Sequence, residues 1–125
     1  MPLKILSLLA FLLLSSCHLR AQDKALMAQA DSLDKLAKEL SHQGKAAEAI
    51  ALGQKAVDIA SAQMGRDNPT YAHFVSNLAG YYSRSGDYDT AMRLGNEALN
   101  IRKEVLGEKH IDYAMSLNNV AKYMA

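Results

Sequence analysis

Apolar residues recur along most of the chain at the spacing of one α-helix face. From Val75, apolar or small residues follow at Leu78, Ala79 and Tyr82, which are the i, i+3, i+4 and i+7 positions. Gly86 comes next and can adopt the left-handed conformation that ends many helices. The same pattern along the chain predicts an all-α fold, with helices over residues 24–43, 45–64, 69–85, 87–106 and 111–125.

Turn residues lie between these helices and group them into pairs. After Gly86, apolar and small positions keep the helical spacing as far as Leu106, and Gly107 ends that helix. Asn68 and Pro69 mark a helix start, because Asn caps the first N–H groups and Pro suits the first helical position. The predicted unit is therefore an antiparallel helical hairpin.

The hairpin repeats along the chain. Displacing the sequence by 42 residues superimposes Gly44 on Gly86 and Tyr71 on Tyr113, among other identities. A fixed period in the range of 20 to 50 residues indicates stacked supersecondary units. The predicted units cover residues 30–71 and 72–113, with an incomplete third unit over 114–125.

Gly53 and Gly95 occupy the same position in successive units, inside the second helix. A glycine there costs about 1 kcal/mol relative to alanine. We expect a neighbouring helix to pass too close for a Cβ atom at both positions. Inheritance from a common ancestral unit is the alternative.

Residues 1–21 have the layout of a secretory signal peptide. Lys4 precedes an uncharged apolar run from Ile5 to Leu14, and small and polar residues follow. A helix of that run would be roughly 15 Å long, about half the hydrocarbon thickness of a bilayer. We therefore expect export rather than a membrane span.

Two cleavage sites remain open. The sequence Leu14-Ser15-Ser16-Cys17 resembles a bacterial lipobox, in which Cys17 would become a lipidated N-terminus. Ala21-Gln22 is typical of an ordinary signal-peptidase junction, and cleavage there leaves residues 22–125 without any cysteine. The expected location is the periplasm, the outer membrane or the medium, with membrane attachment only through the signal peptide or a lipid on Cys17.

Composition and charge mainly exclude classes of function. Fourteen Lys and Arg residues against 13 Asp and Glu give a net charge of +1, which argues against nucleic acid as a partner. No metal-binding, nucleophile–base or phosphate-loop motif is present, and the histidines stand apart at His18, His42, His73 and His110. We predict no catalytic residue, no metal and no cofactor, and we expect His110 with Asp112 to cap a loop.

Residues 77–92, NLAGYYSRSGDYDTAM, resemble a tetratricopeptide repeat, with Ala79, Tyr82, Gly86 and Ala91 at its small, aromatic and turn positions. The usual unit has about 34 residues. The 42-residue period and the loop LGEKHIDYA are similar to kinesin light chain and its bacterial relatives. The resemblance extends over residues 30–125 and implies a right-handed α-solenoid that binds proteins or peptides.

In such a solenoid the first helix of each unit lines the concave face. The resemblance implies that Asn77 and Asn119 bind the backbone of an extended peptide, since an amide both donates and accepts hydrogen bonds. Alternatively, each Asn bonds within its own turn or to water. The other candidates left over from packing are Lys38, His73, Ser76, Gly80, Arg84, Asn118 and Lys122, with Asp34 and Met115 on the same helices.

Two departures from the family pattern limit this interpretation. The first unit has Leu40 and Lys35 where the second has Tyr82 and Asn77, which suits a terminal capping unit. The carboxylate clamp of some family members is absent, because only Asn77 matches it among the corresponding residues Asp34, Lys38, Asn77, Met115 and Asn119.

The third unit stops after its first helix, so Leu117, Val120, Ala121 and Met124 lack the second helix that would cover them. Either the chain is a fragment of a longer protein or this stripe pairs with another chain. The leading hypothesis is an exported, non-catalytic protein- or peptide-binding scaffold. The alternatives are a regulatory or substrate-presenting arm of a longer protein, with a CHAT-type peptidase or a sensor kinase or regulator, and a homo-oligomeric self-association module.

Overall fold

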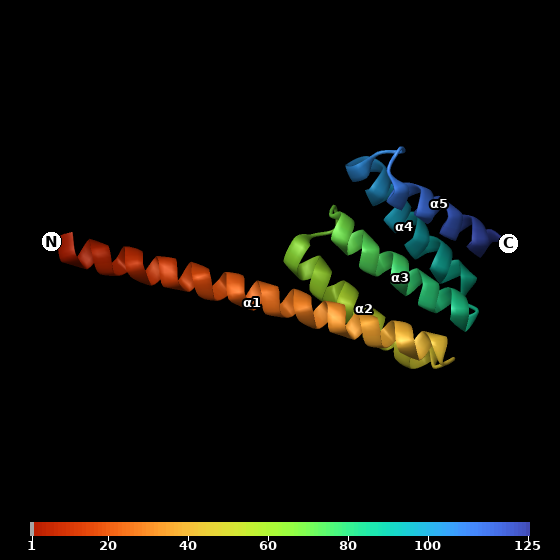
Figure 1. Cartoon of the computed structure of the whole chain (residues 1–125), viewed down its shortest axis with the longest axis horizontal. Coiled ribbons are helices and arrows are strands. Elements are labelled where there is room, and N and C mark those ends of the chain that lie inside the picture. The colour runs from red at the N-terminus through yellow and green to blue at the C-terminus, as the bar shows by residue number, and fades with distance from the viewer. Residues whose placement is uncertain (1) are drawn as a thin grey trace.

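The structure, a computed structural model, describes residues 2–125, with side chains from Ile5 onward. Over these residues it consists of α-helices without strands: α1 (Pro2–His42), α2 (Ala46–Met64), α3 (Pro69–Ser85), α4 (Tyr88–Leu106) and α5 (Ile111–Met124). Figure 1 shows them stacked side by side in antiparallel succession. The all-α prediction is confirmed, and the bounds of α2 to α5 lie within one residue of those predicted.

Helix α1 is longer than the helix predicted over 24–43, because no Gly or Pro interrupts the chain between residues 3 and 42. Its N-terminal half projects from the stack (Figure 1), and the leucines from Leu6 to Leu19 are exposed. By length and composition α1 is apolar enough to cross a membrane, a test that an N-terminal signal sequence also passes. The argument from ten apolar residues alone therefore does not exclude a span.

The helix ends use the local chemistry that the sequence indicated. Asn68 Oδ1 accepts a hydrogen bond from Thr70 N at 2.8 Å, and Pro69 is the first residue of α3. Gly86 ends that helix in the left-handed conformation with φ of 91°. His110 Nδ1 accepts from Asp112 N at 3.0 Å, which confirms the loop-capping role expected for this pair.

Small residues let the helices approach closely. Alanines are fully buried in the helix crossings, and the larger core residues Phe74, Val75 and Leu78 fill the space between α2, α3 and α4. A Cβ at Gly53 would lie 2.9 Å from the Tyr81 ring, and one at Gly95 would lie 3.1 Å from the Tyr123 ring. The close approach expected at both glycines is confirmed.

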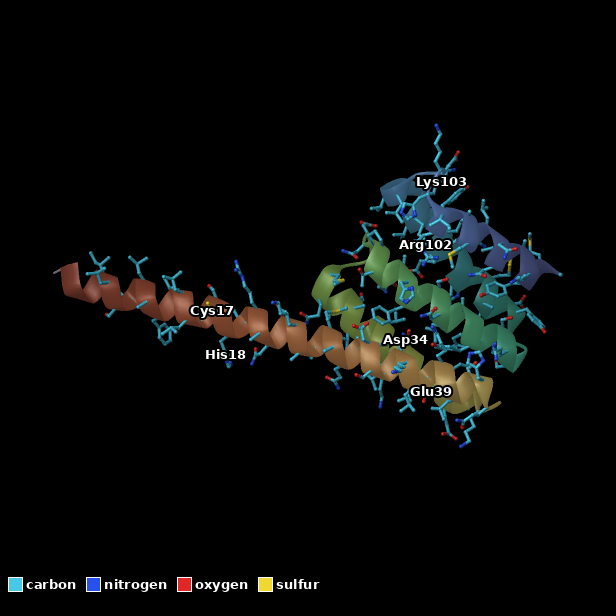
Figure 2. The ribbon with its side chains drawn as sticks, viewed as in Figure 1. Cys17, His18, Asp34, Glu39, Arg102 and Lys103 are labelled. Carbon is cyan, nitrogen blue, oxygen red and sulfur yellow. The ribbon has the colours of Figure 1, made fainter. Side chains whose placement is uncertain are left out.

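The two interfaces between units are filled differently. Ala60 of α2 and Phe74 of α3 are buried at the first, whereas Arg102 and Ser116 hold the same repeat positions at the second. Arg102 Nη1 donates to Ser116 Oγ at 2.7 Å, and Figure 2 shows Arg102 where α4 meets α5. Burial lowers the pKa of Arg102, and Asp112 opposes that shift. The larger side chain of the pair thus comes from the second helix of the two at the first interface, as Phe74, and from the first helix at the second interface, as Arg102.

The apolar stripe expected on α5 is only partly exposed. Val120 is buried, because α5 packs on α4 as α3 packs on α2 and turns this residue toward Gly95. The prediction that Val120 lacks cover was therefore wrong. The other three residues of the stripe, Leu117, Ala121 and Met124, are exposed, as expected.

Candidate functional site

A hollow of about 210 Å³ lies among α1, α3 and α5, the first helices of the three units. We call it the groove. Its lining consists of Lys38, Ser41 and His42 from α1, of Ser76, Asn77, Gly80, Tyr81 and Arg84 from α3, and of Asn119 and Tyr123 from α5. The lining residues lie in the middle or the C-terminal half of each helix.

The groove brings together six of the residues proposed from the sequence: Lys38, Ser76, Asn77, Gly80, Arg84 and Asn119. Three others lie outside it. His73 is exposed one turn before Asn77, with its Nε2 atom 3.3 Å from Asn77 Nδ2. Asn118 and Lys122 are exposed on α5, and Lys122 lines a separate hollow at the end of that helix.

Asp34 lies beneath the groove rather than on its surface. It is only 6% exposed and faces α3, where Asn77 Nδ2 donates to Oδ2 at 2.7 Å and the Tyr81 hydroxyl donates to Oδ1 at 2.8 Å. The expectation that Asp34 belongs to the exposed concave surface was wrong. The contact between α1 and α3 buries it.

This arrangement fixes the orientation of the Asn77 amide. A carboxylate only accepts hydrogen bonds, so the NH₂ group of Asn77 must point toward Asp34. The amide oxygen is then the atom of Asn77 that remains to accept from a ligand. Burial, followed by the hydrogen bond to Asp34, raises the pKa of Tyr81, which therefore stays a neutral donor.

Four residues of the groove were missed from the sequence: Ser41, His42, Tyr81 and Tyr123. Tyr81 and Tyr123 are 42 residues apart, so the repeat itself carried a signal for them. Ser41 carries the same signal, because Ser83 lies 42 residues further along the chain. Ser41 is 6% exposed, and its Oγ has no hydrogen-bond partner in the described part of the chain.

The groove is cationic. Its lining contains the basic side chains of Lys38, Arg84 and His42, and no Asp or Glu. Neither Lys38 nor Arg84 forms a salt bridge with any side chain from Ile5 to Ala125. The surface therefore presents positive charge, hydroxyls and amides to whatever enters.

A second, smaller hollow of about 180 Å³ lies among α2, α3 and α4. Its lining carries both signs of charge, including Arg66, Arg93 and Glu97. Glu97 Oε1 accepts from the Tyr71 hydroxyl at 2.7 Å; burial and then this bond raise the pKa of Tyr71 to about 12. Tyr71 and Glu97 thus tie α3 to α4 within one hairpin.

The groove presents polar and basic side chains. It offers donors, acceptors and cations on an open surface, and no acid–base pair with separated environments of the kind that catalysis uses. Among the described residues no group of three His, Cys, Asp or Glu side chains is placed to hold a metal ion.

Comparison with protein-family models gives a match over most of the chain. The family model described as tetratricopeptide repeat matches residues 26–104 and 72–125. No curated protein matches the chain. Domains of this family generally act as non-catalytic scaffolds for protein interaction. The likeness to kinesin light chain stays a prediction, and what the matches and the stacked helices together establish is that the chain belongs to the tetratricopeptide repeat family.

Proposed function

We propose that this chain is an exported, non-catalytic scaffold that holds an extended peptide in the groove. The observation that carries the proposal is the meeting of polar residues from α1, α3 and α5 around one open hollow. Asn77 would accept from a peptide N–H through its amide oxygen, and Asn119 would supply both a donor and an acceptor one unit further along. Enzymatic activity of the chain itself forms no part of this proposal.

Gly80 provides the sharpest test of peptide binding. It lies within α3 and lines the groove, and an added Cβ there would have no neighbour within 4 Å. Gly80→Leu should therefore fill the groove without disturbing the core, whereas Gly80→Ala leaves most of the hollow open. The assay is panning of a random peptide library on the full chain, kept in mild detergent because of its apolar N-terminal segment.

We expect wild type and Gly80→Ala to enrich peptides and Gly80→Leu to lose them at an unchanged or higher melting temperature. Asn77→Ala with Asn119→Ala should also weaken capture. Equal enrichment by Gly80→Leu would sink the groove as the binding site. A lack of enrichment by wild type over the bare support would sink peptide binding itself.

Export is supported by the exposed apolar segment of α1. Figure 2 shows Cys17 and His18 on the projecting part of that helix, clear of the stack. The first fully buried residue is Ala30, so cleavage at Cys17 or after Ala21 leaves the buried core complete. The intact mass of the native protein from soluble and membrane fractions tests this proposal: an acylated Cys17 or a new N-terminus at Gln22 supports it, and an uncut N-terminus contradicts it.

Self-association through α5 is a second candidate. Met115, Leu117 and Met124 are 55%, 44% and 68% exposed, and neighbouring apolar residues of this size favour contact with another chain. Sedimentation should then show a mass that rises with concentration and a return to monomer for Leu117→Glu. A concentration-independent monomer would contradict this candidate. The arm of a longer peptidase or sensor protein remains a hypothesis from the resemblance alone.

A further inference from the structure

We infer that the groove selects peptides with an Asp or Glu side chain, seated between Lys38 of α1 and Arg84 of α3. This inference rests on the peptide-binding function proposed above and names the chemistry of its ligand. The groove lining includes Lys38, His42 and Arg84 but no carboxylate, so an acidic side chain is the group that the lining lacks.

The carboxylate that bonds to the groove residues forms no salt bridge with these cations. Asp34 is buried beneath the groove and accepts hydrogen bonds from Asn77 and Tyr81. It is more than 4 Å from the Lys38 ammonium, because no salt bridge joins the two. The residues that α5 contributes, Asn119 and Tyr123, are uncharged. Positive charge in the groove is therefore left for a ligand.

Ser41 provides an independent observation. Its hydroxyl is buried next to the groove without a hydrogen-bond partner among the described residues, although helical serines can bond the carbonyl one turn earlier. Unsatisfied buried polar groups are uncommon in folded proteins. Ser41 lies one turn beyond Lys38 on α1, and both line the groove, so this hydroxyl is a candidate donor to a carboxylate held by Lys38.

The choice of a carboxylate over a phosphate follows from the helix ends. Arg84 and His42 lie in the last turns of α3 and α1, where each helix dipole carries about half a negative charge. These partial charges offset part of the cationic field, and no helix N-terminus enters the groove to add N–H donors. The remaining field suits a single negative charge better than the double charge of a phosphate.

The geometry also suits a carboxylate. The Arg84 guanidinium can bind both oxygens of a carboxylate with two parallel N–H donors, while the Lys38 ammonium acts as a point charge. Such exposed pairs are individually weak. We therefore assign them to selectivity among peptides, with most of the affinity coming from backbone contacts.

The test compares two double variants of equal charge change in the library panning described above. Lys38→Glu with Arg84→Glu reverses the charge at both basic positions of the proposed seat. Lys55→Glu with Lys109→Glu is the control, because both lysines are exposed and neither lines the groove. We expect wild type and the control to enrich Asp and Glu in the selected peptides, and the groove variant to lose that excess.

The outcomes separate the inference from the function it rests on. Enriched peptides without an acidic excess, or an excess kept by the groove variant, would overturn the inference and leave peptide binding in place. No enriched peptide at all would remove both. A synthetic peptide from the selection should bind the groove variant about tenfold more weakly, and its affinity for wild type should fall as salt rises.

A final comparison excludes the doubly charged ligand. The selected peptide is remade with its acidic residue replaced by serine and by phosphoserine, and all three forms are titrated into the full chain by fluorescence anisotropy. We expect the acidic form to bind at least as tightly as the phosphoserine form, and the serine form to bind more weakly. Phosphoserine binding roughly tenfold tighter than the acidic form would overturn the assignment to a carboxylate.

Discussion

Alanine substitution at three glycines inside helices separates helix propensity from helix packing. Gly53, Gly80 and Gly95 lie within α2, α3 and α4, so alanine should stabilise each helix by about 1 kcal/mol if nothing else changes. Only the surroundings differ. A Cβ at Gly80 meets nothing within 4 Å, whereas one at Gly53 lies 2.9 Å from the Tyr81 ring and 3.1 Å from Leu78.

The expected order follows from what each neighbour can do. Gly80→Ala should raise the free energy of unfolding by about 1 kcal/mol. At Gly53 the Tyr81 ring is held by its bonds to Asp34, so overpacking of about 1 to 3 kcal/mol should outweigh the gain. Gly95 falls between them, because Tyr123 is 3.1 Å away in the last turn of α5 and can move.

Urea unfolding of the full chain, followed by circular dichroism, measures the three differences at a common slope. Gly95→Leu extends the series, and we expect it to lower the melting temperature sharply because several added carbons meet Tyr123 and Val120. The reasoning is refuted if Gly53→Ala is as stabilising as Gly80→Ala. That result would mean that the glycine at this position reflects ancestry rather than contact.

Three further predictions concern buried polar groups. Tyr81→Phe removes a donor from the Asp34 carboxylate and should lower the free energy of unfolding by about 1.5 to 3 kcal/mol in urea melts, and no change would exclude a structural role for this bond. Arg102→Ala and Ser116→Phe should each destabilise the chain. The double variant rebuilds the Ala–Phe pair of the preceding interface, so it should recover at least about 1 kcal/mol in a double-mutant cycle. Additive losses would contradict the equivalence of the two residue pairs. The pKa of Tyr71 rises from an unfolded value of about 10 to about 12, so its contribution to the free energy of unfolding is complete below pH 10 and is lost as pH rises toward 12. Tyr71→Phe should make the free energy of unfolding fall less steeply in that window. An equally steep fall would contradict the shift.

Local patterns were sufficient to predict most of the fold. Asn68 and Pro69 set a helix start by their own side chains, and Gly86 sets an end by its backbone, so neither depends on distant residues. The 42-residue period then aligned Gly53 with Gly95 and pointed to the close packing there. These features repeat because each unit meets the same neighbour in the same way.

The groove was predicted less completely, because its shape depends on how one unit rests on the next. Asp34 looks like a surface residue in a polar stretch, and only the contact of α1 with α3 buries it against Tyr81. Ser41 and His42 lie at the end of α1, beyond Leu40, the last apolar residue of that helix. Arg102 likewise breaks the small-residue pattern, and only the matching Ser116 makes room for it.

The substantial helix contacts join elements that are neighbours in the chain, together with α1 and α3. In such a linear stack folding can begin in any unit and spread to its neighbours, and opening can begin at an end and pass inward. Chains with mainly local contacts also fold fast, because little loop entropy is lost before contacts form. Amide hydrogens of α3, which packs against α1, α2 and α4, should therefore exchange with solvent last, and a ligand bridging α1, α3 and α5 would delay the opening of both ends at once.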